Sequence, residues 1–141
     1  MRSEEQPKIS FHGVSIIHVN LNVLRLLEDG EHKIDLNVDA KLVPLEEGSR
    51  EFRIWMEADL KVPEYWDIKV VGFGDFELGE DVSSENKRGL ININAPAIMF
   101  PYFRAFVSNL AANCGGSVPF IILPPRLFDG ELEEMKAEEA E

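Results

Sequence analysis

The sequence predicts an α+β fold: a four-stranded antiparallel sheet followed by one long helix and one short C-terminal helix. Apolar and polar residues alternate through much of the first 78 positions, which is the period of half-buried strands. After residue 94, apolar residues recur every three or four positions, which is the period of a helix. No internal repeat or linker divides the 141 residues. We therefore expect a single domain over 1–141, with flexible ends at 1–8 and about 131–141.

The clearest alternation lies at 33–43 and 51–62. In both segments every second residue is apolar, which places one face of the sheet against a core and leaves the other in water. The PLEEGS stretch at 44–49 contains the proline, glycine and serine that are typical of turns. The two segments are therefore expected to form an antiparallel hairpin, with Trp55 on the polar face.

Two further strands are predicted at 9–23 and 66–78. The alternation of the first strand breaks near Val14–Ile16, which suggests a β-bulge before the second run of apolar residues. In the second strand, Gly72 and Gly74 indicate that the backbone bends or that another element packs close to it.

The long helix is predicted over 95–113, after a polar, glycine-bounded segment at 79–89 that we expect to be a loop. Asn94 is suited to cap the start of this helix, and Gly115 is suited to end it. The acidic stretch at 130–141 is expected to be the short helix.

Acidic residues outnumber basic ones by 26 to 14, and the formal charge is −12. This excess argues against nucleic acids and anionic membrane surfaces as partners, because both require basic side chains. No stretch approaches the ~20 apolar residues of a membrane span, and the N-terminus has no signal-peptide core. The single cysteine, Cys114, cannot form an intrachain disulfide. We therefore expect a soluble, cytoplasmic protein.

Residues suited to catalysis or metal binding are sparse. His12, His18 and His32 are the only histidines, and no pair has the spacing of a metal site. Cys114 follows the predicted helix, where the helix dipole disfavours a thiolate. The glycines of 72–79 do not match a phosphate-binding loop. We therefore expect no catalytic residue, no metal and no cofactor.

Apolar residues at positions outside the predicted core are the more informative feature. Trp55 faces the polar side of its strand, and Phe73 and Phe76 lie beside or close to Gly72 and Gly74. The segment 118–128 is apolar but too rich in proline for a regular helix. Exposed apolar surface of this kind commonly binds another chain. The alternative interpretation is that these residues form part of the core beneath a long loop.

A closely spaced set of residues begins at the predicted long helix and comprises Ala95-Pro96, Met99-Phe100-Pro101-Tyr102, Arg104, Val107-Ser108 and Leu110. It continues downstream with Gly115-Gly116, Pro119, Leu123, Pro125, Phe128 and Asp129. Together these residues resemble the long helix, the glycine-rich turn and the P-x-L-x-L-A-P-x-x-F-D segment of SecB, a family of protein-export chaperones. The run from Gly72 to Phe76 is similar to the family's strand ending in G-x-F.

The resemblance implies a SecB-like fold and an ATP-independent holdase that binds unfolded clients and delivers them to a partner. That partner would be the SecA motor of the Sec translocation machinery. The chain would assemble as a homo-oligomer, most simply a dimer of dimers. We assign client binding to Phe73, Phe76, Phe120, Ile122 and Phe128. We assign acidic partner contact to Asp35, Asp39, Glu57 and Asp59. We assign the oligomer interface to Met99, Tyr102, Phe103, Phe106 and Leu110.

Three alternatives stay open. Some SecB-like proteins serve toxin–antitoxin systems, where the client is an unstable antitoxin. A small-ligand carrier or enzyme would need convergent polar groups in a pocket. A structural scaffold would oligomerise without binding unfolded chains. Suppression of the aggregation of an unrelated denatured protein without ATP would separate the chaperones from the other two classes.

Overall fold

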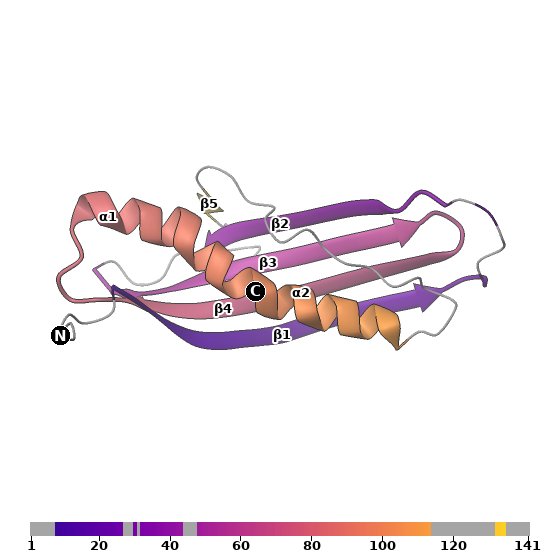
Figure 1. The fold of residues 1–141 in the computed structure, drawn as a ribbon, viewed down its shortest axis with the longest axis horizontal. Helices are drawn as coiled ribbons and strands as arrows, with labels where there is room; N and C mark the ends of the chain where they lie inside the picture. The colour runs from indigo at the N-terminus through magenta and orange to yellow at the C-terminus, as the bar shows by residue number, and fades with distance from the viewer. Residues whose placement is uncertain (1–7, 27–29, 31, 44–47, 114–131, 135–141) are drawn as a thin grey trace, which may run out of the picture.

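The computed structural model describes residues 8–26, 30, 32–43, 48–113 and 132–134. Within these residues, a helical segment lies across one face of a twisted sheet (Figure 1). In chain order, the elements are β1 (Ile9–Val23), β2 (Asp35–Val43), β3 (Glu51–Val62), β4 (Trp66–Leu78), α1 (Ser84–Gly89), η1 (Leu90–Asn94), α2 (Ala95–Ala112) and β5 (Glu133–Glu134). The four predicted strands and the long helix are confirmed.

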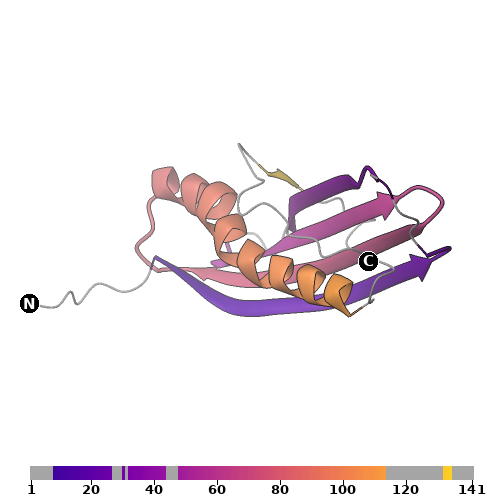
Figure 2. The same ribbon diagram turned by 45° about the vertical axis from the view of Figure 1, so that its right-hand side comes forward.

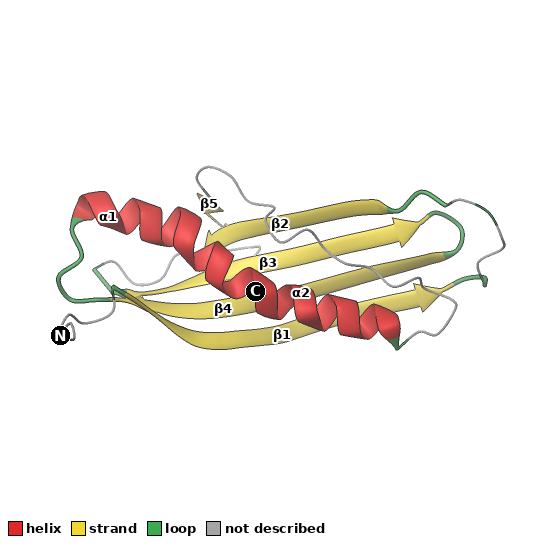
Figure 3. Ribbon diagram, viewed as in Figure 1, coloured by secondary structure: helices red, strands yellow, loops and turns green. Residues whose placement is uncertain are grey.

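The order of strands in the sheet is β1-β4-β3-β2-β5 (Figure 3). The hairpin of β3 and β4 is therefore central, and β1 lies at an edge. The four long strands pair antiparallel, as predicted, whereas β5 pairs parallel with β2. The predicted hairpin of β2 and β3 is confirmed, with Asp39 opposite Glu57 in its register.

The predicted break in β1 is confirmed as two shifts in its register with β4. One lies between Phe11 and Val14, and the other lies between Ile16 and His18. Ile17, which the alternation predicted to face the core, falls in the second shift and is exposed. A bulge inserts an extra residue into one strand, so it removes that residue from the alternation.

The core lies between α2 and the face of the sheet that the helix covers (Figure 2). Gly74 of β4 allows this close approach, because a Cβ atom there would lie 2.7 Å from Met99 Sδ. A Cβ atom at Gly72 would lie 3.5 Å from Phe103 Cδ1, which is an ordinary contact distance. Met99 and Phe103 are both completely buried. The predicted close packing is confirmed, although β4 continues through both glycines without interruption.

The helical segment begins earlier than predicted. Ser83 is its N-cap, because Ser83 Oγ accepts a hydrogen bond of 3.2 Å from the backbone N–H of Asn86. α1 therefore occupies much of the predicted loop at 79–89. Asn94 lies inside the continuous helix with helical backbone angles and no side-chain capping bond, so the predicted cap is wrong. The early start was missed because α1 buries none of its residues and so has no apolar period.

The C-terminal predictions are only partly covered by the described residues. α2 ends at Ala112, with Asn113 as its C-cap, and the predicted stop at Gly115 lies outside those residues. Of the predicted short helix at 130–141, the structure describes 132–134, where Glu133–Glu134 forms the strand β5. The helix prediction is wrong at these two positions.

Candidate functional site

The face of the sheet opposite the helix, which we call the outer face, carries the polar residues of the strands. In β3 the side chains alternate between buried and partly exposed from Phe52 to Leu60. The register between strands arranges the partly exposed positions in rows that cross β2, β3 and β4. One row consists of Lys41, Trp55 and Phe73, and the next contains Asp39 and Glu57 and ends at Val71, which is buried.

The first row places two aromatic rings next to two cations. Trp55 and Phe73 lie opposite each other on β3 and β4. Lys41 Nζ is 5.6 Å from the centre of the Trp55 ring, and Arg53 Cζ is 5.1 Å from the centre of the Phe73 ring. Arg53 Nε also donates a hydrogen bond of 2.7 Å to Asp75 Oδ1. The predicted position of Trp55 on the polar face is confirmed, and both rings remain partly exposed.

The second row brings carboxylates together. Asp39 and Glu57 are directly opposite on neighbouring strands, a placement that is unfavourable for like charges. Burial raises the pKa of the Glu57 carboxyl, and the side-chain hydrogen bond and negative charge of Asp59 raise it further. Lys69 opposes this rise in pKa, since its Nζ lies 3.5 Å from Glu57 Oε1. We call Asp39, Glu57 and Asp59 the acidic cluster.

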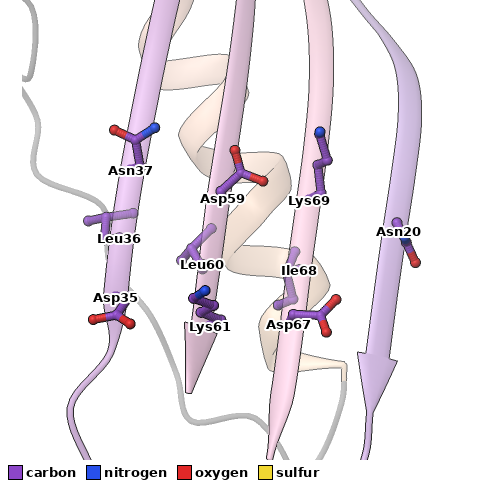
Figure 4. Close-up of a pocket in the computed structure, with 10 residues that line it drawn as sticks. All are labelled: Asn20, Asp35, Leu36, Asn37, Asp59, Leu60, Lys61, Asp67, Ile68 and Lys69. Atoms are coloured by element: carbon purple, nitrogen blue, oxygen red, sulfur yellow. The ribbon is translucent and has the colours of Figure 1, made fainter. Parts of the chain in front are cut away.

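Next to the acidic cluster, the outer face is hollowed near one end of the sheet (Figure 4). The hollow has a volume of about 570 Å³ and is lined by Asn20, Asp35, Leu36, Asn37, Asp59, Leu60, Lys61, Asp67, Ile68 and Lys69. Asp35 and Asp67 both lie opposite Lys61 in the register. Asn22 Nδ2 donates a hydrogen bond of 2.9 Å to Asp67 Oδ1. Charges of both signs therefore meet in this hollow, next to the apolar side chains of Leu36, Leu60 and Ile68.

The four acids predicted to contact a partner, Asp35, Asp39, Glu57 and Asp59, do share the outer face. Sequence reasoning missed Asp67 and Lys69, which β4 contributes beside them. The alternation of apolar and polar residues in WDIKV (66–70) could have identified them, since it places these two side chains on the polar side of the strand. Their position next to β3 required the strand order, which the sequence alone does not specify.

The residues predicted to bind clients do not form one surface. Phe73 lies on the outer face, whereas Phe76 is 1% exposed and belongs to the core. Phe76 packs between Phe11 and Phe52, with ring centres 5.1 and 5.3 Å away. For Phe76, the alternative interpretation as core is therefore the correct one. Phe120, Ile122 and Phe128 lie outside the described residues.

The residues predicted to form the oligomer interface also differ in exposure, and some of them belong to the core. Met99 and Phe103 face the sheet and are completely buried within the chain, so neither can contact another subunit in this conformation. Tyr102 is 60% exposed and packs one side of its ring against Phe11, 5.2 Å away. Phe106 and Leu110 are partly buried against the core. Of these five residues, Tyr102 has the most exposed side chain, so it is the one that stays a proposed contact between subunits.

Apolar side chains are also exposed at the end of the sheet where β1 finishes and β2 begins. Leu24 and Leu26, just after β1, are 63% and 71% exposed. Val23, Ile34 and Leu36 are exposed as well. Tyr65 holds this part of the chain, because its carbonyl oxygen accepts hydrogen bonds from the backbone N–H groups of Leu24 and Arg25. We call the five exposed residues the apolar end.

Neither a metal-binding cluster nor a membrane-spanning helix occurs among the described residues. No group of three or more His, Cys, Asp or Glu side chains among them is arranged to hold a metal ion. In the same part of the chain, no helix has the length and apolar character needed to cross a membrane.

Comparison with known proteins places the chain among relatives of one kind. A family model described as the preprotein translocase subunit SecB matches residues 5–133. The chain belongs to the SecB family. The resemblance stated from the sequence is thereby confirmed, and membership of the SecB family supports a chaperone function.

Individual relatives match this chain to different extents. The protein-export protein SecB of Chromobacterium violaceum is 25% identical over 146 aligned positions, which cover 99% of this chain and 95% of that protein. An uncharacterised protein of Methanocaldococcus jannaschii is 39% identical over 84 residues, 57% of this chain. The matched stretch spans about half, 51%, of that archaeal protein.

A solved structure shows the same fold. The SecB-like chaperone of Mycobacterium tuberculosis, in complex with a ChAD peptide from the HigA1 antitoxin, superposes with a TM-score of 0.64. The match covers 85% of this chain and 88% of that one, at 11% sequence identity. The SecB-like architecture predicted from the sequence is therefore confirmed.

Proposed function

We propose that this SecB-family chain is an ATP-independent holdase that captures unfolded polypeptides. The observation that carries the proposal is the apolar end, where Leu24 and Leu26 are more than half exposed after β1, and Ile34 and Leu36 are exposed at the β2 side of the same end of the sheet. Scattered single apolar residues are ordinary on a protein surface, but a group of them marks an interaction site. An unfolded chain offers the matching chemistry, since its own apolar side chains are not yet buried.

Binding of this kind is passive. A client bound at the apolar end is withdrawn from folding and aggregation by mass action, so no nucleotide hydrolysis is required. Phe73 on the outer face and Phe120, Ile122 and Phe128 stay proposed client contacts, whereas Phe76 acts through the core. We keep a non-enzymatic, cytoplasmic homotetramer, built as a dimer of dimers, as part of this proposal.

Aggregation of an unrelated, chemically denatured protein tests the holdase proposal directly. The purified chain should suppress light scattering without ATP. The double change Leu24→Ser and Leu26→Ser should lower that suppression several-fold, because each serine removes apolar surface available to the client. Ile93→Ser is the matched control, since Ile93 is 58% exposed but lies on the helical segment. Equal suppression by wild type and the double variant would remove the apolar end from the proposal.

The acidic cluster is the proposed contact with a receiving partner, which for a SecB relative would be the Sec translocation machinery. Asp39, Glu57 and Asp59 present negative charge beside the partly exposed rings of Trp55 and Phe73. A basic partner segment with an apolar anchor would match this arrangement. Asp35 extends the same acidic surface toward the hollow.

Charge reversal tests the acidic cluster. The variant Asp39→Lys, Glu57→Lys should lose affinity for a SecA-type motor at least tenfold while still suppressing aggregation. Binding of the wild type should weaken between low and moderate salt, since exposed charges are screened beyond about 10 Å at 0.1 M. Because the Glu57 pKa is raised, mild acidification should protonate this residue before ordinary glutamates and weaken the complex too. A complex that is insensitive to salt and to both reversals would contradict the proposal.

An antitoxin is the second candidate client. The Mycobacterium tuberculosis relative with the same fold was solved with an antitoxin peptide, which favours this option. A dedicated antitoxin chaperone would bind one short segment tightly and unrelated unfolded chains weakly. Competition between such a peptide and a denatured model protein, measured by fluorescence anisotropy, separates a dedicated chaperone from a general one. A pure scaffold would bind neither.

A further inference from the structure

The edge of β2 is partly occupied by the chain's own C-terminal strand. Glu133 and Glu134 of β5 pair in parallel with Lys41 and Leu42 (Figure 1). The rest of this edge, residues 35–40, has no strand beside it within the part of the chain that the structure describes. An open edge presents unpaired backbone N–H and C=O groups that another extended chain can bind.

The burial of side chains along β2 also differs between the part that pairs with β5 and the part that does not. On the side that faces the core, Ala40 is 7% exposed next to the segment that β5 pairs with, whereas Leu36 is 40% exposed where no strand is paired. Ile34, just before β2, is 36% exposed. An extended segment added beside residues 35–40 could therefore cover apolar side chains as well as pair its backbone.

A single asparagine side chain connects the helical segment to β5. The backbone N–H of Leu132 donates a hydrogen bond of 2.7 Å to Asn92 Oδ1. Asn92 Nδ2 donates to the carbonyl oxygen of Arg88 at 2.9 Å, which fixes the orientation of the amide. Leu132 also packs against the core. The Asn92 amide is thus hydrogen-bonded at both of its polar atoms. Its nitrogen bonds to the helical segment, and its oxygen bonds to the residue just before β5.

Asn92 lies in the π-helical turn η1, where Ala95 N–H bonds to the Leu90 carbonyl oxygen. The residue that would bond the Asn92 carbonyl in a regular helix is Pro96, which has no N–H group. π-turns are rare, occur mostly as single turns inside α-helices and are frequent at functional sites. The local sequence therefore accounts for the turn in which Asn92 reaches Leu132.

The hold of β5 on β2 is nevertheless weak. Among the described residues, β5 forms two residue pairs with β2, and they are parallel, which is the less stable type of pairing. Both residues of β5 are glutamates, which are depleted in strands. A longer segment with apolar side chains would pair with more of the edge and would cover Leu36.

We propose that β5 is a displaceable occupant of the β2 edge, held by Asn92, and that an extended client segment competes with it. This inference rests on the proposed holdase function. It adds where a client binds, the β2 edge, and which segment of the chain it competes with, β5. The occupant that displaces β5 is an unfolded polypeptide segment carrying apolar side chains, since Ile34 and Leu36 lie exposed beside the open edge. Asn92 is a positioning residue that sets the strength of the competition.

Hydrogen exchange without any client tests the role of Asn92. Asn92→Ala should speed exchange of the amides in the peptide containing Lys41 and Leu42 by about fivefold, the factor that one net hydrogen bond is worth. Asn92→Asp keeps an oxygen acceptor for Leu132 and should retain most of the protection. Asn86→Ala is the control, because Asn86 is exposed and its side chain makes no hydrogen bond among the described residues. Unchanged exchange in Asn92→Ala would overturn the proposed hold.

Client affinity tests the competition. A reduced, permanently unfolded polypeptide should bind Asn92→Ala about fivefold more tightly than wild type, and a chain ending at residue 131, which lacks β5, about tenfold more tightly. Circular dichroism checks that both variants are folded, and Asn86→Ala should bind like wild type. Equal affinity in wild type and both variants would reject the competition and leave the holdase proposal standing. Absence of binding in every chain, wild type included, would reject both.

Discussion

Replacing Phe103 with aspartate is expected to unfold the chain, whereas the same replacement at Tyr102 should leave it folded and weaken assembly. Phe103 is completely buried against the sheet, so the variant loses its packing and places an unpaired charge in the core. The expected loss is about 4 kcal/mol or more, which is comparable with the whole stability of many domains. Tyr102 is 60% exposed, so aspartate there remains in water in the free subunit.

Two measurements separate these outcomes. Urea unfolding followed by circular dichroism should show no cooperative transition for Phe103→Asp and a nearly unchanged one for Tyr102→Asp. Sedimentation velocity should show a smaller species for Tyr102→Asp if the exposed flank of α2 forms the oligomer interface. A folded, dissociated Phe103→Asp variant would instead mean that the buried side of α2 is shared between subunits.

After Phe103→Asp, the change expected to lower the stability of the fold most is the addition of a methyl group at Gly74. A Cβ atom there would lie 2.7 Å from Met99 Sδ and 3.0 Å from Phe76 Cε2, distances that well-packed atoms do not adopt. Because Met99 is completely buried, it cannot move aside into solvent. Gly74→Ala should therefore cost about 1–3 kcal/mol, the usual penalty for overpacking a core.

Gly89→Ala is the matched control for Gly74→Ala. Gly89 lies in the helical segment with nothing within 4 Å of an added Cβ, so alanine there should stabilise the fold by about 0.4–1 kcal/mol. In a Met99→Ala background the penalty of Gly74→Ala should shrink, because Met99 Sδ and Cγ are gone and only Phe76 Cε2 remains close. Denaturant midpoints of wild type, the two single variants and the double variant measure this coupling. A penalty that persists in full without the Met99 side chain would place its cause in Phe76 or in the strand backbone instead.

The strands were predictable because one face of the sheet is buried along most of its length. Burial forces the period of two that is visible in residues 33–43 and 51–62. α1 was not predictable in this way, since none of its residues is buried. Its start depends on one local hydrogen bond, the cap at Ser83, and many serines in a sequence offer such a bond without starting a helix.

The sites were less predictable than the strands because they depend on which side chains meet. The apolar residues of α2 were interpreted as an interface, but the sheet buries Met99 and Phe103 completely, and Gly74 on β4 leaves the space for Met99. The acids of β2 and β3 were placed on the correct face from alternation. Their nearest neighbours depend on strand register and strand order, which place Asp39 opposite Glu57 and Lys69 next to Glu57.

The order β1-β4-β3-β2-β5 has a consequence for synthesis on the ribosome. Ile9 pairs with Leu78, so β1 finds its partner strand only after 69 further residues have been added. At about 5–20 residues per second, this wait lasts roughly 3–14 s. During that interval the apolar side of β1 has no sheet to join. A protein proposed to protect unfolded chains therefore itself carries an unpaired strand while it is being synthesised. Translation speed should influence what fraction of the chain reaches the folded state.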